Sequence, residues 1–144
     1  MSSSLLIPNP TIPATVDGCL EATRKVEAIL QSLPQVELDT FNSLHAGVYS
    51  RTVRMPAGVM LTGALIKIPT ILTIVGDLTL TVGDHTEDVK GFRLFECAAG
   101  RKQIMLAKTE SYVTMSFATD AKSVEEAEEQ FTDEFENLMS RRKQ

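Results

Sequence analysis

Side chains that could bind a small molecule are few in this chain. Tyr49, Arg51, Lys67 and Gln103 offer a phenol, two cations and an amide. Such a set could hold an anion or a sugar by charge-assisted and neutral hydrogen bonds. We predict these four as the ligand-binding residues. The alternative is that the two cations are solvated or pair with carboxylates elsewhere in the chain.

Residues suited to general acid–base catalysis are also few. The candidates are His45, Tyr49, Glu96 and Tyr112, because this chemistry places a histidine or a carboxyl group beside the reacting proton. The sequence has no glycine-rich phosphate loop and no Ser-His-Asp pattern. We therefore expect no catalytic residues, and an enzyme is the less favoured interpretation.

Potential metal ligands are equally sparse. His45 and His85 are the only histidines, and Cys19 and Cys97 are the only cysteines. The cysteines are far apart and form no CxxC pattern, so we expect two reduced, partly buried thiols. A first-row metal needs three or four converging ligands. We expect neither a metal nor a cofactor; the alternative is a two-histidine site completed by Asp84, Glu87 or Glu96.

The composition is that of an ordinary globular domain with an acidic end. The 144 residues are 43% hydrophobic and 23% charged, and seven of the 19 acidic residues lie within residues 123–144. This distribution lacks the basic surface of nucleic-acid-binding proteins. The N-terminus has no signal-peptide pattern, and no apolar run approaches the ~20 residues of a membrane span. We expect a protein that is cytoplasmic when made, without nucleic-acid or membrane partners.

The N-terminal part is predicted to form an extended arm and a helix. Residues 1–14 contain three prolines, which favour extended backbone. This arm lies along its own domain as an edge strand, reaches onto a neighbouring subunit, or is disordered. Residues 16–33 repeat apolar side chains at helical spacing, with Asp17 as an N-cap or first-turn acid and Pro34 beyond the end.

Residues 47–118 have the pattern of short β-strands separated by turns. Pro56-Ala57-Gly58, Gly76-Asp77 and Gly83-Asp84 are the predicted turns, and Gly63 marks a bend in a strand. Short strands at this spacing indicate a sandwich or barrel. The predicted strands are residues 47–55, 59–68, 71–75, 78–82, 89–96, 103–107 and 111–118.

The last segment is predicted to be an amphipathic helix. Ser123 and Glu126 form a capping box, and apolar side chains then recur at steps of three and four. We therefore divide the chain into the arm at residues 1–14, a helix plus barrel at residues 15–122, and an acidic helix at residues 123–144.

A further set of features lies within residues 47–118: Tyr49-Ser50-Arg51, Pro56-Ala57-Gly58, Gly63, Lys67, the strand ending in Gly76 and the turn Ala99-Gly100-Arg101. In these features the segment resembles the cupins, small β-barrels of the jelly-roll type. The resemblance extends to the short cupin-like proteins encoded by tailed bacteriophages and prophages. It implies a mainly β fold, a small antiparallel jelly-roll barrel with an N-terminal helix and a C-terminal amphipathic helix.

The resemblance also implies that the metal-ligand positions are lost. Metal-binding cupins carry a His-x-His pair where this chain has Ile66 and Ile68, and an acidic ligand near Thr70 or Leu72. Their second motif has a histidine where this chain has Gln103.

These observations lead to two functional hypotheses. The first is a non-catalytic structural or assembly protein, phage- or prophage-encoded, acting as a homo-oligomer and contacting other virion proteins. The alternative is a metal-independent cupin-type enzyme or sensor that binds a sugar or another small molecule in the barrel. A regulator that binds another protein through its acidic helix is a third, less favoured, interpretation.

Overall fold

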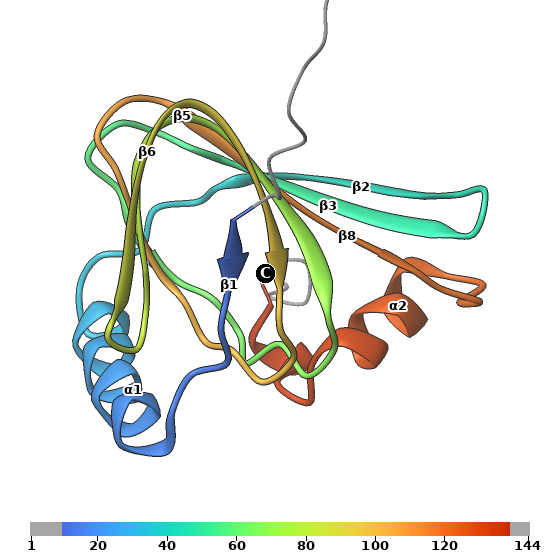
Figure 1. Cartoon of the computed structure of the whole chain (residues 1–144), viewed down its shortest axis with the longest axis horizontal. Helices are drawn as coiled ribbons and strands as arrows, with labels where there is room; N and C mark the ends of the chain where they lie inside the picture. Colours follow the sequence, from blue (N-terminus) through green and yellow to red (C-terminus); the bar gives the residue numbers. More distant parts are fainter. Residues whose placement is uncertain (1–9, 139–144) are drawn as a thin grey trace, which may run out of the picture.

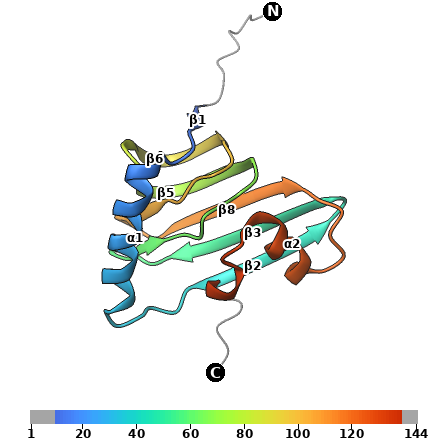
Figure 2. The ribbon, with the colours of Figure 1, turned by 90° about the horizontal axis from the view of Figure 1, so that it is seen from below.

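The computed structural model describes residues 10–138, which form a curved β-sheet with two helices on one side of it (Figures 1 and 2). The predicted mainly β fold with a helix towards each end is confirmed. The elements, in chain order, are β1 (Thr11–Ile12), α1 (Asp17–Gln31), β2 (Asp39–His45), β3 (Val48–Met55), β4 (Met60–Thr62), β5 (Thr70–Val82), β6 (His85–Cys97), β7 (Ile104–Ala107), β8 (Ser111–Ala118), α2 (Val124–Phe131) and a 3₁₀ helix (Phe135–Asn137).

The sheet rolls up but does not close. Its strands follow the order β1-β6-β5-β8-β3-β2, so β1 and β2 are its edges, and β7 pairs with both β4 and the second half of β5. The described end of the predicted arm is β1, which pairs in parallel with the end of β6. The rest of the arm, residues 1–9, lies outside the described residues.

Alternation along the strands separates an inner face from an outer face. On β8, for example, the odd-numbered residues Ser111 to Phe117 are buried and the even-numbered residues are more exposed. The inner faces form one apolar core with side chains from β3, β5, β6 and β7. Both helices lie on this inner side, so the outer face of the sheet carries no described helix (Figure 2).

Strand β5 corrects one prediction. Gly76-Asp77 is not a turn: a single strand of 13 residues runs through it. Gly76 has a φ of +141°, and a Cβ atom there would lie 2.2 Å from Ser111 Oγ. The glycine is needed because β8 approaches closely, not because the chain reverses. The predicted turn at Gly83-Asp84 is confirmed, since Val82 pairs with His85 across it.

Strand β2 was not predicted, although it has seven residues. Its burial alternates weakly because most of its side chains are exposed. It joins β3 through a two-residue hairpin turn, in which Ala46 and Gly47 have φ values of +55° and +73°.

The predicted C-terminal helix is wrong for residues 132–138, because α2 ends at Phe131. Ser123 does cap it, since its Oγ accepts a hydrogen bond from the Glu126 N–H. At Thr132 the backbone becomes extended, and Thr132 Oγ1 donates to the Leu65 carbonyl at 2.7 Å. The Lys67 N–H also donates to the Phe131 carbonyl. These contacts with the segment after β4 end the helix, and residues 139–144 lie outside the described part.

None of the helices that the structure describes is long and apolar enough to cross a membrane.

Candidate ligand cavity

A cavity of about 450 Å³ lies between the inner face of the sheet, the C-terminal end of α1 and the segment after α2. Most of its wall is apolar, and its polar side chains come from several separate parts of the chain. Its lining includes Glu27, Leu30, Leu38, Thr40, Arg51, Val53, Leu61, Ile66, Gln103, Met105, Val113, Met115, Phe131, Glu134 and Leu138.

Arg51 reaches this cavity from the inner face of β3. Alternation along the strand puts Tyr49, Arg51 and Met55 on the inner side. The Arg51 side chain is about 10% exposed, and its Nη1 lies 3.1 Å from Glu128 Oε2. Because Glu128 is also buried, this is an ion pair inside the protein, and removing one partner would leave a buried charge.

Tyr49 lies behind Arg51 and does not line the cavity. Its ring packs against Phe117 and Phe131, with centroid distances of 5.4 and 6.3 Å. Its hydroxyl donates to Asn42 Oδ1 at 2.5 Å and accepts from Arg51 Nη1 at 3.4 Å. Burial raises the pKa of the Tyr49 phenol, and the neighbouring guanidinium opposes that shift only in part. Tyr49 therefore stays neutral and orients Arg51.

Gln103 lies on the opposite wall, where Arg101 fixes its amide. Arg101 Nε donates to Gln103 Oε1 at 3.1 Å, which leaves the amide nitrogen beside the Met105 sulfur. The Arg101 guanidinium also donates to Thr70 Oγ1 at 2.6 Å and to the Ala98 carbonyl at 3.2 Å. Burial lowers the pKa of Arg101, and the three groups that accept its hydrogen bonds are all neutral.

Lys67 lies outside the cavity. Its side chain is 42% exposed, and Nζ lies 2.6 Å from Asp133 Oδ1. Of the four predicted binding residues, the structure thus brings Arg51 and Gln103 to one cavity. It places Tyr49 directly behind Arg51 and Lys67 at the surface.

Sequence reasoning missed one polar group of the cavity wall. Thr40 lines the cavity from β2, and its buried Oγ1 has no hydrogen-bond partner among the described residues. A buried hydroxyl without a partner is costly, so this atom is a natural contact point for a water or a ligand. No signal in the sequence marks Thr40, because β2 lacks a clear alternating pattern.

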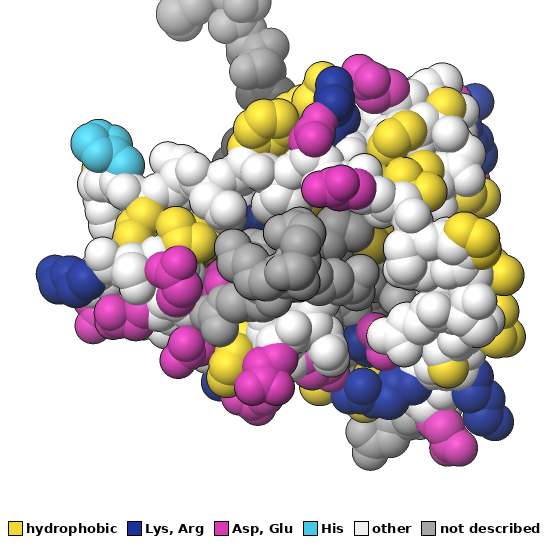
Figure 3. Space-filling view, turned by 180° about the vertical axis from the view of Figure 1, so that it is seen from behind, with side chains coloured by type: hydrophobic (Ala, Val, Ile, Leu, Met, Phe, Trp, Pro, Cys, Tyr) yellow, Lys and Arg dark blue, Asp and Glu magenta, His cyan; other side chains and the backbone are white. Residues whose placement is uncertain are grey.

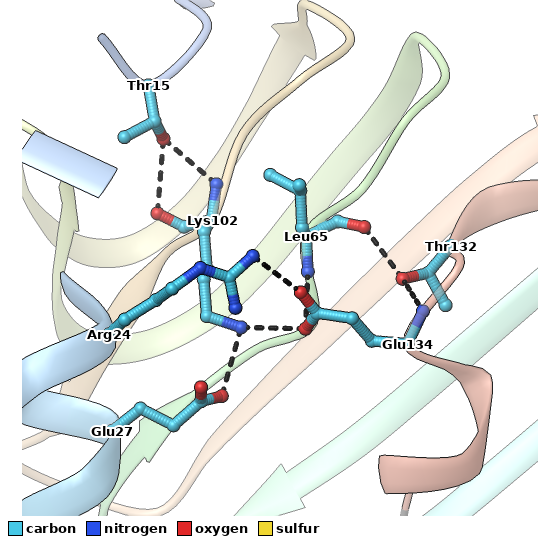
Figure 4. A network of polar contacts seen from close by, with 7 residues as sticks. All are labelled: Thr15, Arg24, Glu27, Leu65, Lys102, Thr132 and Glu134. Atoms are coloured by element: carbon cyan, nitrogen blue, oxygen red, sulfur yellow. Dashed lines mark hydrogen bonds and ion pairs between the residues drawn. The ribbon is translucent and has the colours of Figure 1, made fainter. Parts of the chain in front are cut away.

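A buried lysine holds the rim of the cavity together (Figure 4). Lys102 Nζ is fully buried and lies 2.9 Å from both Glu27 Oε2 on α1 and Glu134 Oε1 after α2. Glu134 also accepts hydrogen bonds from Arg24 and from the Leu65 N–H. Burial alone would raise the pKa of Glu134, but the Lys102 ammonium and Arg24 hold it below its ordinary value.

The residues considered for catalysis do not gather around the cavity. His45 ends β2, Tyr112 lies on the outer face of β8, and Glu96 lies near the end of β6, where it pairs with Ile71. His85 pairs with Glu87 at 2.7 Å. Within residues 10–138 no three His, Cys, Asp or Glu side chains are close enough to share a metal ion. Ile66 is buried on the cavity wall, and Ile68 packs against the core.

The charged side chains are unevenly placed on the surface. In Figure 3 Asp and Glu gather near the centre and the lower left of one face, whereas Lys and Arg stand mainly at its rim. Cys19 and Cys97 are both free thiols, as predicted. Burial raises the pKa of the Cys97 thiol, which disfavours its reactive thiolate form.

Comparisons with known proteins find likenesses of fold. No family model and no curated protein matches the chain. Among solved structures it is similar to a cupin superfamily protein from Desulfitobacterium hafniense, with 12% identity, a TM-score of 0.49, and coverage of 61% of this chain and 83% of that one. It is also similar to the cupin domain of Schizosaccharomyces pombe Cnp3, with 20% identity, a TM-score of 0.45 and coverage of 63% and 67%. A third, an RmlC-like cupin family protein from Methanocaldococcus jannaschii with a double-stranded β-helix fold, shows 15% identity, a TM-score of 0.48 and coverage of 58% and 81%.

Proposed function

We propose that this chain is a non-catalytic structural or assembly protein that works as a homo-oligomer through the outer face of its sheet. The observation that carries the proposal is the position of the exposed apolar side chains. Of the eleven large hydrophobic residues that are exposed in the described part, six lie on this one face: Phe41, Val48, Ile71, Val75, Phe92 and Tyr112.

The strand registers arrange these side chains in rows across β2, β3, β8, β5 and β6. One row joins Asp39, Arg54, Tyr112, Val75 and Phe92. The next row runs from Phe41 on β2 to Leu94 on β6. The third row runs from Ser43 on β2 to Glu96 on β6. With five strands about 4.8 Å apart and rows about 6.8 Å apart, the patch measures roughly 20 Å by 20 Å with its side chains. Two such patches bury roughly 800 Å² in total, below the standard class of about 1,200–2,000 Å², so the face suits a weak interface.

Several polar groups of this face are already paired within the chain. Ser50 and Ser116 share a hydrogen bond of 2.8 Å, and Thr52 and Thr114 share one of 2.7 Å. Arg54 forms an ion pair with Asp39 at the edge. Because paired hydroxyls lose little on leaving water, a second copy can cover them at low cost. Tyr112, Val75 and Phe92 are adjacent in one row, and grouped exposed apolar side chains of this kind mark an interaction site.

Size-exclusion chromatography with light scattering tests this proposal. The full chain should be oligomeric at micromolar concentration, and Phe92→Glu should lower the mass of the oligomer. Ile29→Glu on α1 is the matched control, since Ile29 and Phe92 are both 62% exposed but only Phe92 lies on the sheet. A monomeric wild-type chain, or equal oligomer in wild type and Phe92→Glu, contradicts the proposal.

The finer proposal, a phage- or prophage-encoded component or assembly factor of a virion, is supported by the sequence resemblance alone. Mass spectrometry of purified particles from a host that carries the gene tests it. The chain should be found in the particle or in its assembly intermediates, and its absence from both contradicts this part of the proposal.

A second candidate function, binding of a small molecule, is favoured by the cavity. Its volume of about 450 Å³ is typical of ligand pockets. Arg51, Gln103 and the unpaired Thr40 Oγ1 supply a few polar contacts within apolar walls. A sugar or a small carboxylate would meet a donor from Arg51 and an amide from Gln103.

Thermal denaturation with panels of sugars and small carboxylates tests this candidate. A ligand at 100 times its Kd should stabilise the folded chain by about 2.7 kcal/mol. Gln103→Leu should abolish the stabilisation, whereas Lys67→Met, outside the cavity, should keep it. No stabilisation by any compound, or equal stabilisation of both variants, argues against the cavity as a binding site.

A further inference from the structure

The free edge of β2 is the feature from which we infer a second contact between copies. Within the described residues, β2 pairs only with β3, so one side of its backbone has no strand beside it. Exposed sheet edges are usually protected by Lys, Pro, bulges or short length. Residues Asp39–His45 contain no Lys, Arg, Pro or Gly, and seven residues make a full-length strand.

We propose that β2 pairs in antiparallel fashion with β2 of a second copy, with Asn42 opposite Asn42. Two conditions select this register. All seven residues of both strands must pair, and the outer faces of both sheets must stay on the same side, which requires that side chains on the same face lie opposite each other. Only the register centred on Asn42 meets both conditions.

The side chains of the strand fit this arrangement. Asp39 then lies opposite His45 of the second copy, and Phe41 lies opposite Ser43. An acid faces an imidazole at each end, so the two ends attract when the imidazole is protonated. A parallel pairing in the same register would instead set Asp39 beside Asp39, which is unfavourable.

Pairing at this edge goes beyond the proposed function, because it uses the backbone of β2 rather than the side chains of the outer face. It adds hydrogen bonds to N–H and C=O groups that otherwise face water. It also joins the sheets of the two copies into one continuous sheet through the path β6-β5-β8-β3-β2 of each copy. The outer face of that sheet is continuous across the junction, so the rows through Phe41 and Ser43 extend from one copy into the next.

Disulfide cross-linking of the full chain tests the register. In a Cys19→Ser background, Asn42→Cys should give a covalent dimer on mild oxidation, because residues opposite in an antiparallel pair have Cα atoms about 4.5–5.5 Å apart. His45→Cys is the matched control on the same strand. In this register the two copies of residue 45 are about 20 Å apart, six residues along the strand, so no dimer should form.

A second pair of variants leaves the Asn42–Tyr49 hydrogen bond intact. A mixture of Phe41→Cys and Ser43→Cys chains should cross-link, whereas either chain alone should not, since like positions are then about 8 Å apart. Cross-links that form equally at residues 42 and 45, or that fail to form at 42 and in the mixture, overturn the proposal.

The same assay separates this inference from the proposed contact through the face. In the Phe92→Glu background the cross-link at residue 42 should persist, because Phe92 is on β6, four strands away from β2. Loss of that cross-link together with the oligomer assigns association to the face alone and overturns pairing at the edge. Persistence of the cross-link together with an oligomer mass equal to that of the wild type supports the edge and contradicts the face.

Discussion

Arg101 and Lys102 are neighbours in the chain, and both are fully buried, yet the protein holds the two cations in opposite ways. Lys102 lies between the carboxylates of Glu27 and Glu134. The Arg101 guanidinium donates instead to a hydroxyl, an amide oxygen and a backbone carbonyl.

This difference follows from the chemistry of the two groups. An ammonium concentrates its charge and loses much hydration on burial, so it needs counter-charges. A guanidinium spreads its charge over a plane and is more weakly hydrated, so neutral acceptors can hold it. As a result Lys102 connects α1 to the segment after α2, whereas Arg101 braces only the strand ends near Thr70 and Ala98.

The largest expected effect is that of removing the Lys102 charge. Lys102→Met should lower the free energy of unfolding by about 3 kcal/mol, because Glu27 and Glu134 lose the cation between them. Urea denaturation measures this loss. Lys108→Met is the control, since Lys108 is half-exposed and its nearest carboxylate lies 3.8 Å away. A loss below about 1 kcal/mol would show that Lys102 does not hold the two carboxylates in solution.

Arg101→Met should cost less, about 1–2 kcal/mol. The substitution leaves three acceptors without a donor, but it also removes a buried charge whose hydrogen-bond acceptors are all neutral. The same urea titration compares the two variants directly. A larger loss for Arg101→Met than for Lys102→Met would reverse the comparison.

The contacts around Lys102 should also make the free energy of unfolding depend on pH, whereas those around Arg101 should not. The pKa of Glu134 is lowered in the folded state, so its carboxylate stabilises the fold above its ordinary pKa of 4.5. That contribution is lost as the pH falls through the lower, folded-state pKa. Unfolding free energies measured from neutral pH to about pH 3 should therefore fall more steeply for wild type than for Glu134→Gln. Arg101→Met should keep the wild-type slope, and equal slopes in all three chains would contradict the assignment to Glu134.

The smallest expected effect is that of Arg24→Ala. Arg24 lies 2.9 Å from Glu134, but its side chain is 45% exposed, and Lys102 still neutralises the carboxylate. The loss in unfolding free energy should be about 0.5 kcal/mol and should shrink in high salt. A loss as large as that of Lys102→Met would place the main charge of the cluster at Arg24.

Sequence patterns predicted the parts of the fold in which local signals agree with tertiary packing. Strand β8 was predicted with its observed bounds, and β3 to within one residue, because one face of each is buried and alternation is clear. Strand β2 was missed because an edge strand has little buried surface to leave a pattern. The helix beyond Phe131 was overpredicted because Thr132 and Glu134 bond to residues far away in the chain.

The candidate site was predictable only in part. Arg51 was identifiable because alternation on β3 places it on an inner face, where an arginine is unusual. Lys102 and Glu134 carry no such signal, since nothing local to the sequence shows that two residues 32 positions apart meet in the interior. Thr40 could not be identified from the sequence, because strand β2 itself was not predicted.

The pairing of strand β5 determines which parts of the domain can unfold locally. It pairs with β6 along all 13 residues, with β8 through its first half and with β7 through its second half. Strands β6, β7 and β8 cannot detach without breaking hydrogen bonds to β5, so opening at any of them loses many contacts for little gain in entropy. Amide protons in the middle of β5 should exchange with solvent only when the whole domain unfolds, and those of β2 well before.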